Sequence, residues 1–174
     1  MRVIAEQGYA GATQRSIAAE AGVSAASTHY FFDSVEELIR EAATAYLEER
    51  LTFYEQAIDT FAAGDHDIAD GCRQAAVLLS AVSTEARSAQ FEIYLNAQRQ
   101  PLLQATVLDS IERLEALVVR LLEVLQVPEP DRWTTILLSI GDGFALRAVA
   151  GAPAPVEALE RALLAIAAAA QDAG

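Results

Sequence analysis

The stretch from Ser16 to Phe32, SIAAEAGVSAASTHYFF, decides the fold of the N-terminal part of the chain. Just before it, Thr13 is a favourable N-cap for a short helix that ends near Ala21. Gly22 supplies the permissive backbone that a tight turn needs, and Ser24 can cap a second short helix. Two helices joined by a short turn that contains glycine form a helix-turn-helix.

The apolar residues of this stretch agree with that layout. Ile17, Ala21 and Val23 are apolar where the two helices must face each other, and the small Ala18 lies where they approach most closely. We therefore predict that the second helix, about residues 25–31, is a recognition helix whose N-terminal side chains point at the DNA major groove.

The rest of the chain is also predicted to be helical. Ser34 and Glu37 form an S-x-x-E capping box, which predicts a long helix from residue 34 to about residue 62. Apolar residues recur at helical spacing, and no stretch alternates as a strand would. Turn residues separate five further predicted helices, at residues 68–82, 84–100, 101–126, 131–150 and 156–171.

The expected fold class is therefore all-α. We predict two domains: a three-helix helix-turn-helix domain over residues 1–45, with an incomplete first helix, and a helical effector-binding and dimerisation domain over residues 46–174.

Composition narrows the possible functions. The chain has 174 residues and a net charge of −13, and all twelve of its basic residues are arginines. This acidity argues against non-specific binding to nucleic acid or to an anionic membrane. No apolar run approaches the roughly 20 residues of a membrane span. The single cysteine, Cys72, cannot form an intrachain disulfide, and we predict a cytoplasmic location.

No catalytic, metal or cofactor motif is recognised, and we predict that the protein is not an enzyme. Glu36 and Glu37 are adjacent on a helix and do not face the same point, which argues against paired acid/base catalysis. Carboxylates in the first turn of a helix instead complement the helix dipole. Asp65, His66 and Asp67 lack the spacing of known metal sites, and we predict that they form a solvated loop. Cys72 is read as a small core residue, with a redox sensor as the alternative.

The first forty residues also resemble the DNA-binding domain of the tetracycline-repressor (TetR) family of bacterial regulators. The residues that carry the resemblance keep their order and spacing: Gly8, Tyr9, Thr13, Arg15, Ile17, Ala18, Ala21, Gly22, Val23, Ser24, His29, Tyr30, Phe32, Ser34, Glu36, Glu37 and Leu38. The resemblance implies a ligand-responsive transcriptional repressor. Such a protein binds a pseudo-palindromic double-stranded DNA operator as a homodimer, and a small apolar or aromatic effector releases it.

Seven residues are predicted to contact DNA. Thr13 and Gln14 can donate to phosphate at a helix N-terminus, and Arg15 can bind a phosphate or a guanine edge. Thr13 as a plain N-cap, a solvated Arg15 and an inward-packed Tyr30 remain alternatives. The predicted contacts are Thr13, Gln14, Arg15, Ala25, Ser27, His29 and Tyr30.

Several departures from the family pattern motivate a competing hypothesis. Ala25 and Val35 stand where many members carry lysine, and only Val3 to Gln7 match the family's longer first helix. Residues 1–45 hold three arginines against six carboxylates, a net charge of 3 − 6 = −3, which is unfavourable for a phosphate-binding surface. The alternative is a helical small-molecule or partner-binding protein on the same scaffold that has lost DNA binding.

Two predicted helices carry candidate effector-binding residues. An apolar, aromatic-lined cavity with few polar groups is the usual form of a small-molecule pocket. Ordinary core packing is the alternative for each residue, and Glu92 falls on another helix face and is expected to be solvated. The candidates are Phe91, Tyr94, Leu95, Gln98, Trp133, Leu137, Ile140 and Phe144.

The last two helices carry the predicted dimer interface. The segment from Ile140 to Leu146 looks like the penultimate helix of the TetR family, in which the last two helices of each subunit form a four-helix bundle. Gly141 and Gly143 are costly inside a helix, and close helix–helix approach is one reason to keep them. The predicted interface residues are Gly141, Gly143, Phe144, Arg147, Ala148, Leu159, Ala162, Leu163 and Ile166.

Overall fold

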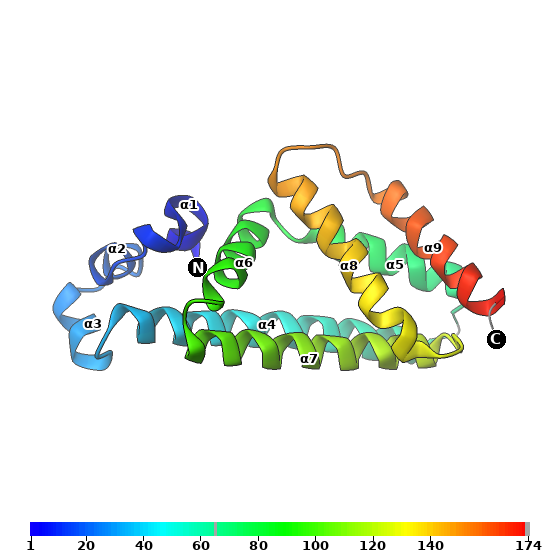
Figure 1. Ribbon diagram of the computed structural model, residues 1–174, viewed down its shortest axis with the longest axis horizontal. Helices are drawn as coiled ribbons and strands as arrows, with labels where there is room; N and C mark the ends of the chain where they lie inside the picture. The colour runs from blue at the N-terminus through cyan, green and yellow to red at the C-terminus, as the bar shows by residue number, and fades with distance from the viewer. Residues whose placement is uncertain (65, 173–174) are drawn as a thin grey trace. The chain divides into compact units, whose positions relative to one another are not determined.

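The computed structural model describes residues 1–64 and 66–172, and every regular element in these ranges is an α-helix. The all-α prediction is confirmed, and the predicted helix ends lie within about one turn of the observed ones. The helices of the described residues (Figure 1) are α1 (Arg2–Gly11), α2 (Gln14–Glu20), α3 (Ala25–Phe31), α4 (Val35–Ala62), α5 (Ile68–Ala81), α6 (Thr84–Ala97), α7 (Pro101–Val124), α8 (Pro130–Val149) and α9 (Val156–Asp172).

Side-chain caps explain where the longer helices begin. The Ser34 hydroxyl accepts the backbone N–H of Glu37 at 3.0 Å, and the Glu37 carboxylate accepts the N–H of Asp33 at 2.8 Å. The predicted cap of α4 is therefore present, with the carboxylate bound one residue earlier than a capping box requires. Asp67 caps α5 by accepting the N–H of Asp70 at 2.8 Å. The predicted loop residue Asp65 lies outside the described residues.

The chain divides into two compact units. The first contains Met1–Arg50 and Glu85–Ile111, and the second contains Leu51–Thr84 and Glu112–Gly174. Helices α4 and α7 therefore contribute to both units, whereas α6 belongs to the first and α5, α8 and α9 to the second. The whole predicted DNA-binding domain lies inside the first unit. The predicted domain boundary at residue 45 stays a prediction.

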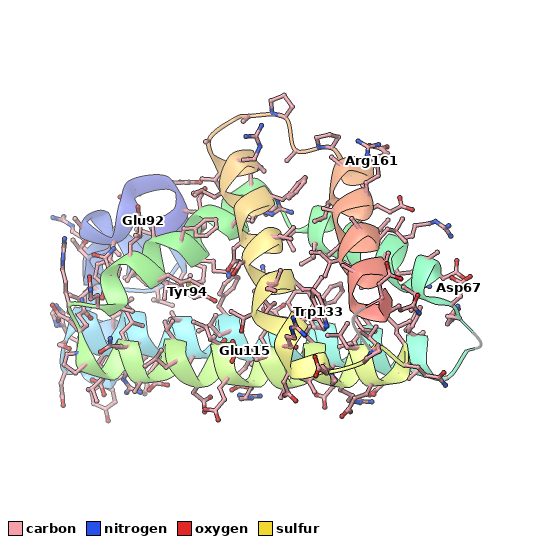
Figure 2. The ribbon with its side chains drawn as sticks, turned by 45° about the vertical axis from the view of Figure 1, so that its right-hand side comes forward. Asp67, Glu92, Tyr94, Glu115, Trp133 and Arg161 are labelled. Atoms are coloured by element: carbon pink, nitrogen blue, oxygen red, sulfur yellow. The ribbon has the colours of Figure 1, made fainter. Side chains whose placement is uncertain are left out.

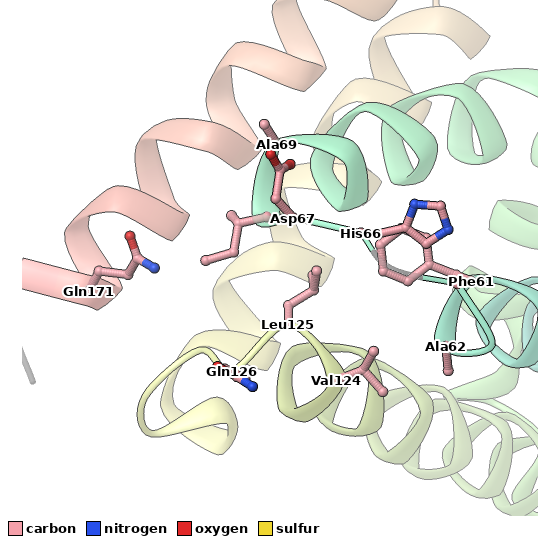
Figure 3. A pocket seen from close by; sticks show the side chains of 11 residues that line it. Phe61, Ala62, His66, Asp67, Ala69, Val124, Leu125, Gln126 and Gln171 are labelled. Carbon is pink, nitrogen blue, oxygen red and sulfur yellow. The ribbon is translucent and has the colours of Figure 1, made fainter.

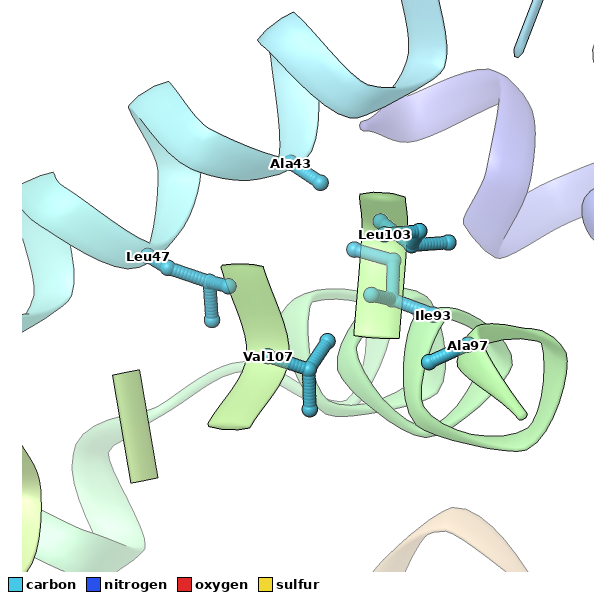
Figure 4. Close-up of a cluster of buried hydrophobic side chains, with 6 residues drawn as sticks. All are labelled: Ala43, Leu47, Ile93, Ala97, Leu103 and Val107. Atoms are coloured by element: carbon cyan, nitrogen blue, oxygen red, sulfur yellow. The ribbon is translucent and has the colours of Figure 1, made fainter. Parts of the chain in front are cut away.

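Two hydrophobic clusters hold the first unit together. One joins α4, α6 and α7 (Figure 4) and consists of Ala43, Leu47, Ile93, Ala97, Leu103 and Val107. The other joins α1 to α4 and consists of Val3, Ile4, Ala12 and Ile39. Met1 and Tyr9 pack against both clusters, so α1 is bound to the same core that α6 completes.

The second unit also has two hydrophobic clusters. Helix α5 packs on α9 through Cys72, Ala76, Leu159 and Leu163. The second cluster joins the C-terminal ends of α4, α7 and α9 through Phe61, Leu122, Leu125, Val127 and Ala170. Helix α8 packs on both α5 and α9. No helix in the described part of the chain is long and apolar enough to cross a membrane.

Cys72 is buried in the core between α5 and α9. Burial, and secondarily the nearby Glu160 carboxylate, raise the pKa of the Cys72 thiol. A raised pKa leaves less thiolate at neutral pH, and the thiolate is the reactive form. The structure therefore favours the core interpretation of Cys72 over a redox sensor.

We predict that Cys72 in the native protein reacts with Ellman's reagent about a hundredfold more slowly at about pH 8 than in urea-unfolded protein. Thiolate release followed by absorbance measures both rates. A native rate equal to that of the unfolded chain would show that the thiol is exposed and contradict its placement in the core.

Candidate nucleic-acid interface

Thr13 and Ser16 fix the start of α2. The Thr13 hydroxyl accepts the Ser16 backbone N–H at 3.0 Å, and the Ser16 hydroxyl accepts the Thr13 N–H at 2.9 Å. This is a reciprocal capping box in which serine replaces the usual Glu or Gln. The predicted N-cap role of Thr13 is confirmed. Sequence reasoning missed the part played by Ser16.

The turn between α2 and α3 is built as the sequence predicts. Gly22 has φ = 68°, a left-handed conformation that glycine adopts without steric penalty. The next helix, α3, is capped by Ser24, whose hydroxyl accepts the Ser27 N–H at 3.1 Å. Together these two residues give the short turn of a helix-turn-helix.

Fewer residues are buried between α2 and α3 than the sequence predicted. Ala18 is buried and Ile17 is half-buried, but Ala21 and Val23 are exposed. The buried residue of α3 is Thr28, whose hydroxyl donates to the Ala25 carbonyl at 2.8 Å and so needs no partner from α2. Ala21 and Val23 lie in the turn between the two helices and not on a packed helix face, which is why they stay exposed.

Gln14 is part of the interior of the helix-turn-helix. The residue is only 9% exposed, and Nε2 donates to the Phe32 carbonyl at 3.4 Å. The amide therefore links the start of α2 to the end of α3. This placement is at odds with the predicted phosphate contact and removes Gln14 from the candidate interface.

The exposed face of α3 carries aromatic side chains. Tyr30 is 84% exposed and Phe31 73%, and their rings meet edge to face with centroids 5.0 Å apart. The alternative that Tyr30 packs inward does not hold. His29 is also exposed, whereas Ala25 and Ser27 are half-buried. Phe31 was not predicted as a site residue, although three consecutive aromatic residues at the end of so short a helix could not all be buried.

Among the arginines of residues 1–45, Arg15 is the one without a carboxylate partner in the described structure. Arg2 pairs with Glu20, and this hydrogen bond and charge raise the pKa of the Arg2 guanidinium. Arg40 pairs with Glu41 at 2.6 Å. Arg15 is exposed beside the N-terminus of α2. The Arg15 guanidinium is therefore the arginine side chain of residues 1–45 that is available to bind an external anion.

The predicted effector residues on α6 have different environments. Ala89, Ile93 and Ala97 form the buried face of α6. Phe91 and Tyr94 are half-buried, and the Tyr94 hydroxyl accepts a hydrogen bond from Gln90 Nε2 at 3.1 Å. Gln98 and Leu95 are exposed, the latter at 72%.

The predicted effector residues on α8 are all half-buried and pack against the core of the second unit. Trp133 and Leu137 pack against the cluster around Leu122, and Ile140 and Phe144 pack against the cluster around Leu159. Figure 2 labels Trp133 on α8 and Tyr94 on α6, which belong to different compact units. That the two sets line one pocket stays a prediction.

The structure has a separate open cavity of about 680 Å³ within the second unit. Figure 3 shows it between the ends of α4, α7 and α9 and the start of α5. His66 stacks on Phe61 at its edge, with ring centroids 4.4 Å apart. None of the predicted effector residues lines this cavity, and most of its lining side chains are exposed.

The predicted dimer residues separate into two groups. Leu159 and Leu163 are only 2% and 5% exposed and pack against α5 of their own chain, so they are not available to a second subunit. Helical periodicity identified them as apolar but could not tell a core face from an interface.

The remaining predicted dimer residues keep some exposure. Gly143 and Arg147 are exposed; Gly141, Phe144, Ala148, Ala162 and Ile166 are half-buried. An added side chain at Gly143 would meet nothing within 4 Å. Ile136 and Leu146 are exposed on the same helix at positions that helical spacing places on the side of Gly143. These two apolar residues were missed by the sequence prediction.

Comparison with protein families gives matches at both ends of the chain. Residues 1–42 match the model of the bacterial regulatory proteins, tetR family. Residues 63–169 match the model of the tetracyclin repressor-like C-terminal domain. No curated protein matches the chain.

Solved structures with the same fold include the following three proteins. A transcriptional regulator from Rhodococcus sp. Rha1 is 24% identical with a TM-score of 0.79, covering 98% of this chain and 91% of its own. A protein from Saccharomonospora viridis, described as a transcriptional regulator in complex with choline, is 20% identical with a TM-score of 0.74, over 93% and 88%. A TetR transcription regulator from Haloarcula marismortui is 21% identical with a TM-score of 0.73, over 97% and 92%.

We predict that Gln14→Ala lowers the free energy of unfolding by about 1–2 kcal/mol, because it removes a buried hydrogen bond and its packing. Tyr30→Ala should change the free energy of unfolding by no more than about 0.5 kcal/mol, because the ring is exposed. Urea unfolding followed by circular dichroism measures both. Equal losses in the two variants would contradict the burial of Gln14 and the exposure of Tyr30.

Proposed function

We propose that this chain, which belongs to the tetR family of bacterial DNA-binding transcriptional regulators, is a cytoplasmic repressor that a small apolar or aromatic effector releases from its operator. The observation that carries the proposal is the exposed surface of the helix-turn-helix. Arg15, His29 and Tyr30 lie on two short helices whose ends are fixed by Thr13, Ser16 and Ser24.

Each of these side chains has a distinct role in the proposed interface. Arg15 supplies the positive charge for a phosphate or a guanine edge. His29 and Tyr30 on α3 contact base edges and backbone in the major groove, with Ser27 and Ala25 at the start of the helix. Phe31 joins Tyr30 as an apolar surface suited to a thymine methyl group. Thr13 can contact phosphate while it caps α2.

The proposed dimer uses the exposed side of α8 together with α9. Ile136, Gly143 and Leu146 give an apolar surface with space for close approach at the glycine. Arg147, Ala148, Ala162 and Ile166 extend this surface, whereas Leu159 and Leu163 remain in the subunit core. A two-fold dimer presents two recognition helices to a pseudo-palindromic operator.

The proposed effector remains an apolar or aromatic small molecule. The choline complex of the Saccharomonospora viridis protein supports a small-molecule ligand in proteins of this fold. A quaternary ammonium ion is usually held over aromatic faces. In this chain the Arg132 guanidinium already lies 5.4 Å from the centroid of Trp133, the one tryptophan. This contact favours an uncharged ligand at that ring.

Release from the operator then follows from a population shift. The effector binds better to the conformation in which the two recognition helices do not match the operator spacing, and so it lowers operator affinity. The test is binding to the DNA upstream of the protein's own gene at several salt concentrations. Specific, salt-sensitive binding would support the proposal. A well-folded dimer that binds no DNA from its own genome would favour an effector-binding protein that has lost DNA binding.

We predict that Arg15→Ala weakens operator binding and reduces the slope of log affinity against log salt by about one, because one phosphate contact is lost. Arg40→Ala is the matched control, since Arg40 is already paired with Glu41. Fluorescence anisotropy at four salt concentrations gives both slopes. A slope unchanged by Arg15→Ala would remove Arg15 from the interface.

We predict that Tyr30→Ala abolishes specific operator binding while the dimer survives, because the ring lies on the exposed face of α3. Phe53→Ala is the control, since Phe53 is a partly exposed aromatic residue on α4. Gel-shift titration measures binding, and light scattering measures the dimer. Operator affinity equal to that of the unchanged protein would contradict the assignment of α3 as the recognition helix.

A further inference from the structure

Helix α1 is broken at Gly8. This residue has φ = 70° and ψ = 172°, a conformation that is essentially confined to glycine. In a continuous helix the Tyr9 backbone N–H would bond to the carbonyl four residues earlier. The break removes that partner and leaves a donor that has to be satisfied from elsewhere in the fold.

Glu92 on α6 supplies the missing acceptor. Its Oε2 accepts the Tyr9 N–H at 2.9 Å, in a part-buried position. An added side chain at Gly8 would lie 3.7 Å from the same oxygen, so the broken backbone runs directly against the carboxylate. The sequence-based expectation that Glu92 is solvated is therefore wrong. Figure 2 labels Glu92, which comes from the helix next to α1 in the first unit.

A second hydrogen bond holds the same residue. The Tyr9 hydroxyl donates to Gln100 Oε1 at 2.7 Å, and the Tyr9 ring packs against the cluster that joins α4, α6 and α7. Glu92 and Gln100 thus bind the two ends of one residue, the backbone amide and the hydroxyl. We call the bonds from Glu92 and Gln100 to Tyr9 the Tyr9 clamp.

Tyr9 is connected to the helix-turn-helix by a short series of hydrogen bonds. Its carbonyl accepts the Ala12 N–H at 3.2 Å, and the Gly11 carbonyl accepts both the Thr13 N–H at 3.1 Å and the Ser16 hydroxyl at 2.9 Å. Thr13 and Ser16 form the capping box of α2. The position of Tyr9 therefore sets the position of the first helix of the DNA-binding motif.

Apolar packing alone would define the orientation of the helix-turn-helix only loosely. Val3, Ile4, Ala12 and Ile39 attach α1 to α4, but hydrophobic contact is not directional. A hydrogen bond to a carboxylate is directional and stronger than one between neutral groups. Glu92 is thus the group that can fix the angle of the segment between Gly8 and Thr13.

We propose that Glu92 is a positioning residue that orients the helix-turn-helix relative to α6 through the backbone amide of Tyr9. The inference rests on the proposed function, because its consequence is operator affinity. It assigns to α6 a part in DNA recognition through a residue that does not itself touch DNA.

The experiment compares Glu92→Ala, which removes the acceptor, with Glu92→Gln, whose amide oxygen can still accept the Tyr9 N–H. Glu85→Ala on the same helix is the control for loss of one exposed negative charge. Nitroxide labels on cysteines introduced at the exposed positions His29 and Gln98, in a Cys72→Ser background, report the distance from α3 to α6. Labelled protein is diluted with unlabelled protein for the distance measurement, and operator affinity is measured separately on the unlabelled variants, in which His29 is intact.

We expect Glu92→Ala to broaden the label distance distribution about twofold and to weaken operator binding about tenfold. The affinity falls because a loosely oriented helix-turn-helix loses more conformational freedom when it binds DNA. Glu92→Gln and Glu85→Ala should stay within about threefold of the unchanged affinity, with narrow distributions. Rescue by glutamine separates positioning from a simple loss of charge.

A narrow distribution in Glu92→Ala would overturn the proposal, and so would a broad distribution with unchanged operator affinity. Equal broadening in Glu92→Gln and Glu92→Ala would also overturn it, because the hydrogen bond would not be the cause. If the unchanged protein binds no operator, the proposed function fails. The distance distributions then still decide whether Glu92 orients the helix-turn-helix.

Discussion

The helix-turn-helix depends on hydrogen bonds at the ends of two helices that are too short to be stable alone. Isolated helices shorter than about 12 residues are marginal in water, and α2 and α3 have seven residues each. Thr13 with Ser16 fixes one N-terminus and Ser24 fixes the other, while Gln14 links the two helices through the Phe32 carbonyl. These local and buried bonds, together with the cluster around Ile39, hold the backbone that carries the exposed surface of the helix-turn-helix.

Local sequence signals predicted the helices well. Thr13, Ser24 and Ser34 are caps in the structure, and Gly22 has the positive φ that its turn requires. These features depend on residues within four positions of one another, so they can be recognised without knowledge of the tertiary fold. The resemblance to the TetR family over the first forty residues carried the functional prediction.

Features that depend on tertiary contacts were predicted less well. Gln14 was expected at the DNA surface and is buried, because its partner is a carbonyl 18 residues away. Leu159 and Leu163 were expected at a dimer interface but pack on α5, since periodicity shows only that a face is apolar. Glu92 was expected in solvent because nothing near it in the sequence reveals that the amide of Tyr9 needs an acceptor.

The bond between Glu92 and Tyr9 has a consequence for comparing related sequences. The group that Glu92 binds is a main-chain N–H, which every residue except proline carries. Position 9 can therefore change its side chain without losing this bond, and no pairwise covariation between positions 9 and 92 is expected from it. The constraint would be visible instead as a glycine at position 8, the exclusion of proline at position 9 and a persistent acceptor at position 92.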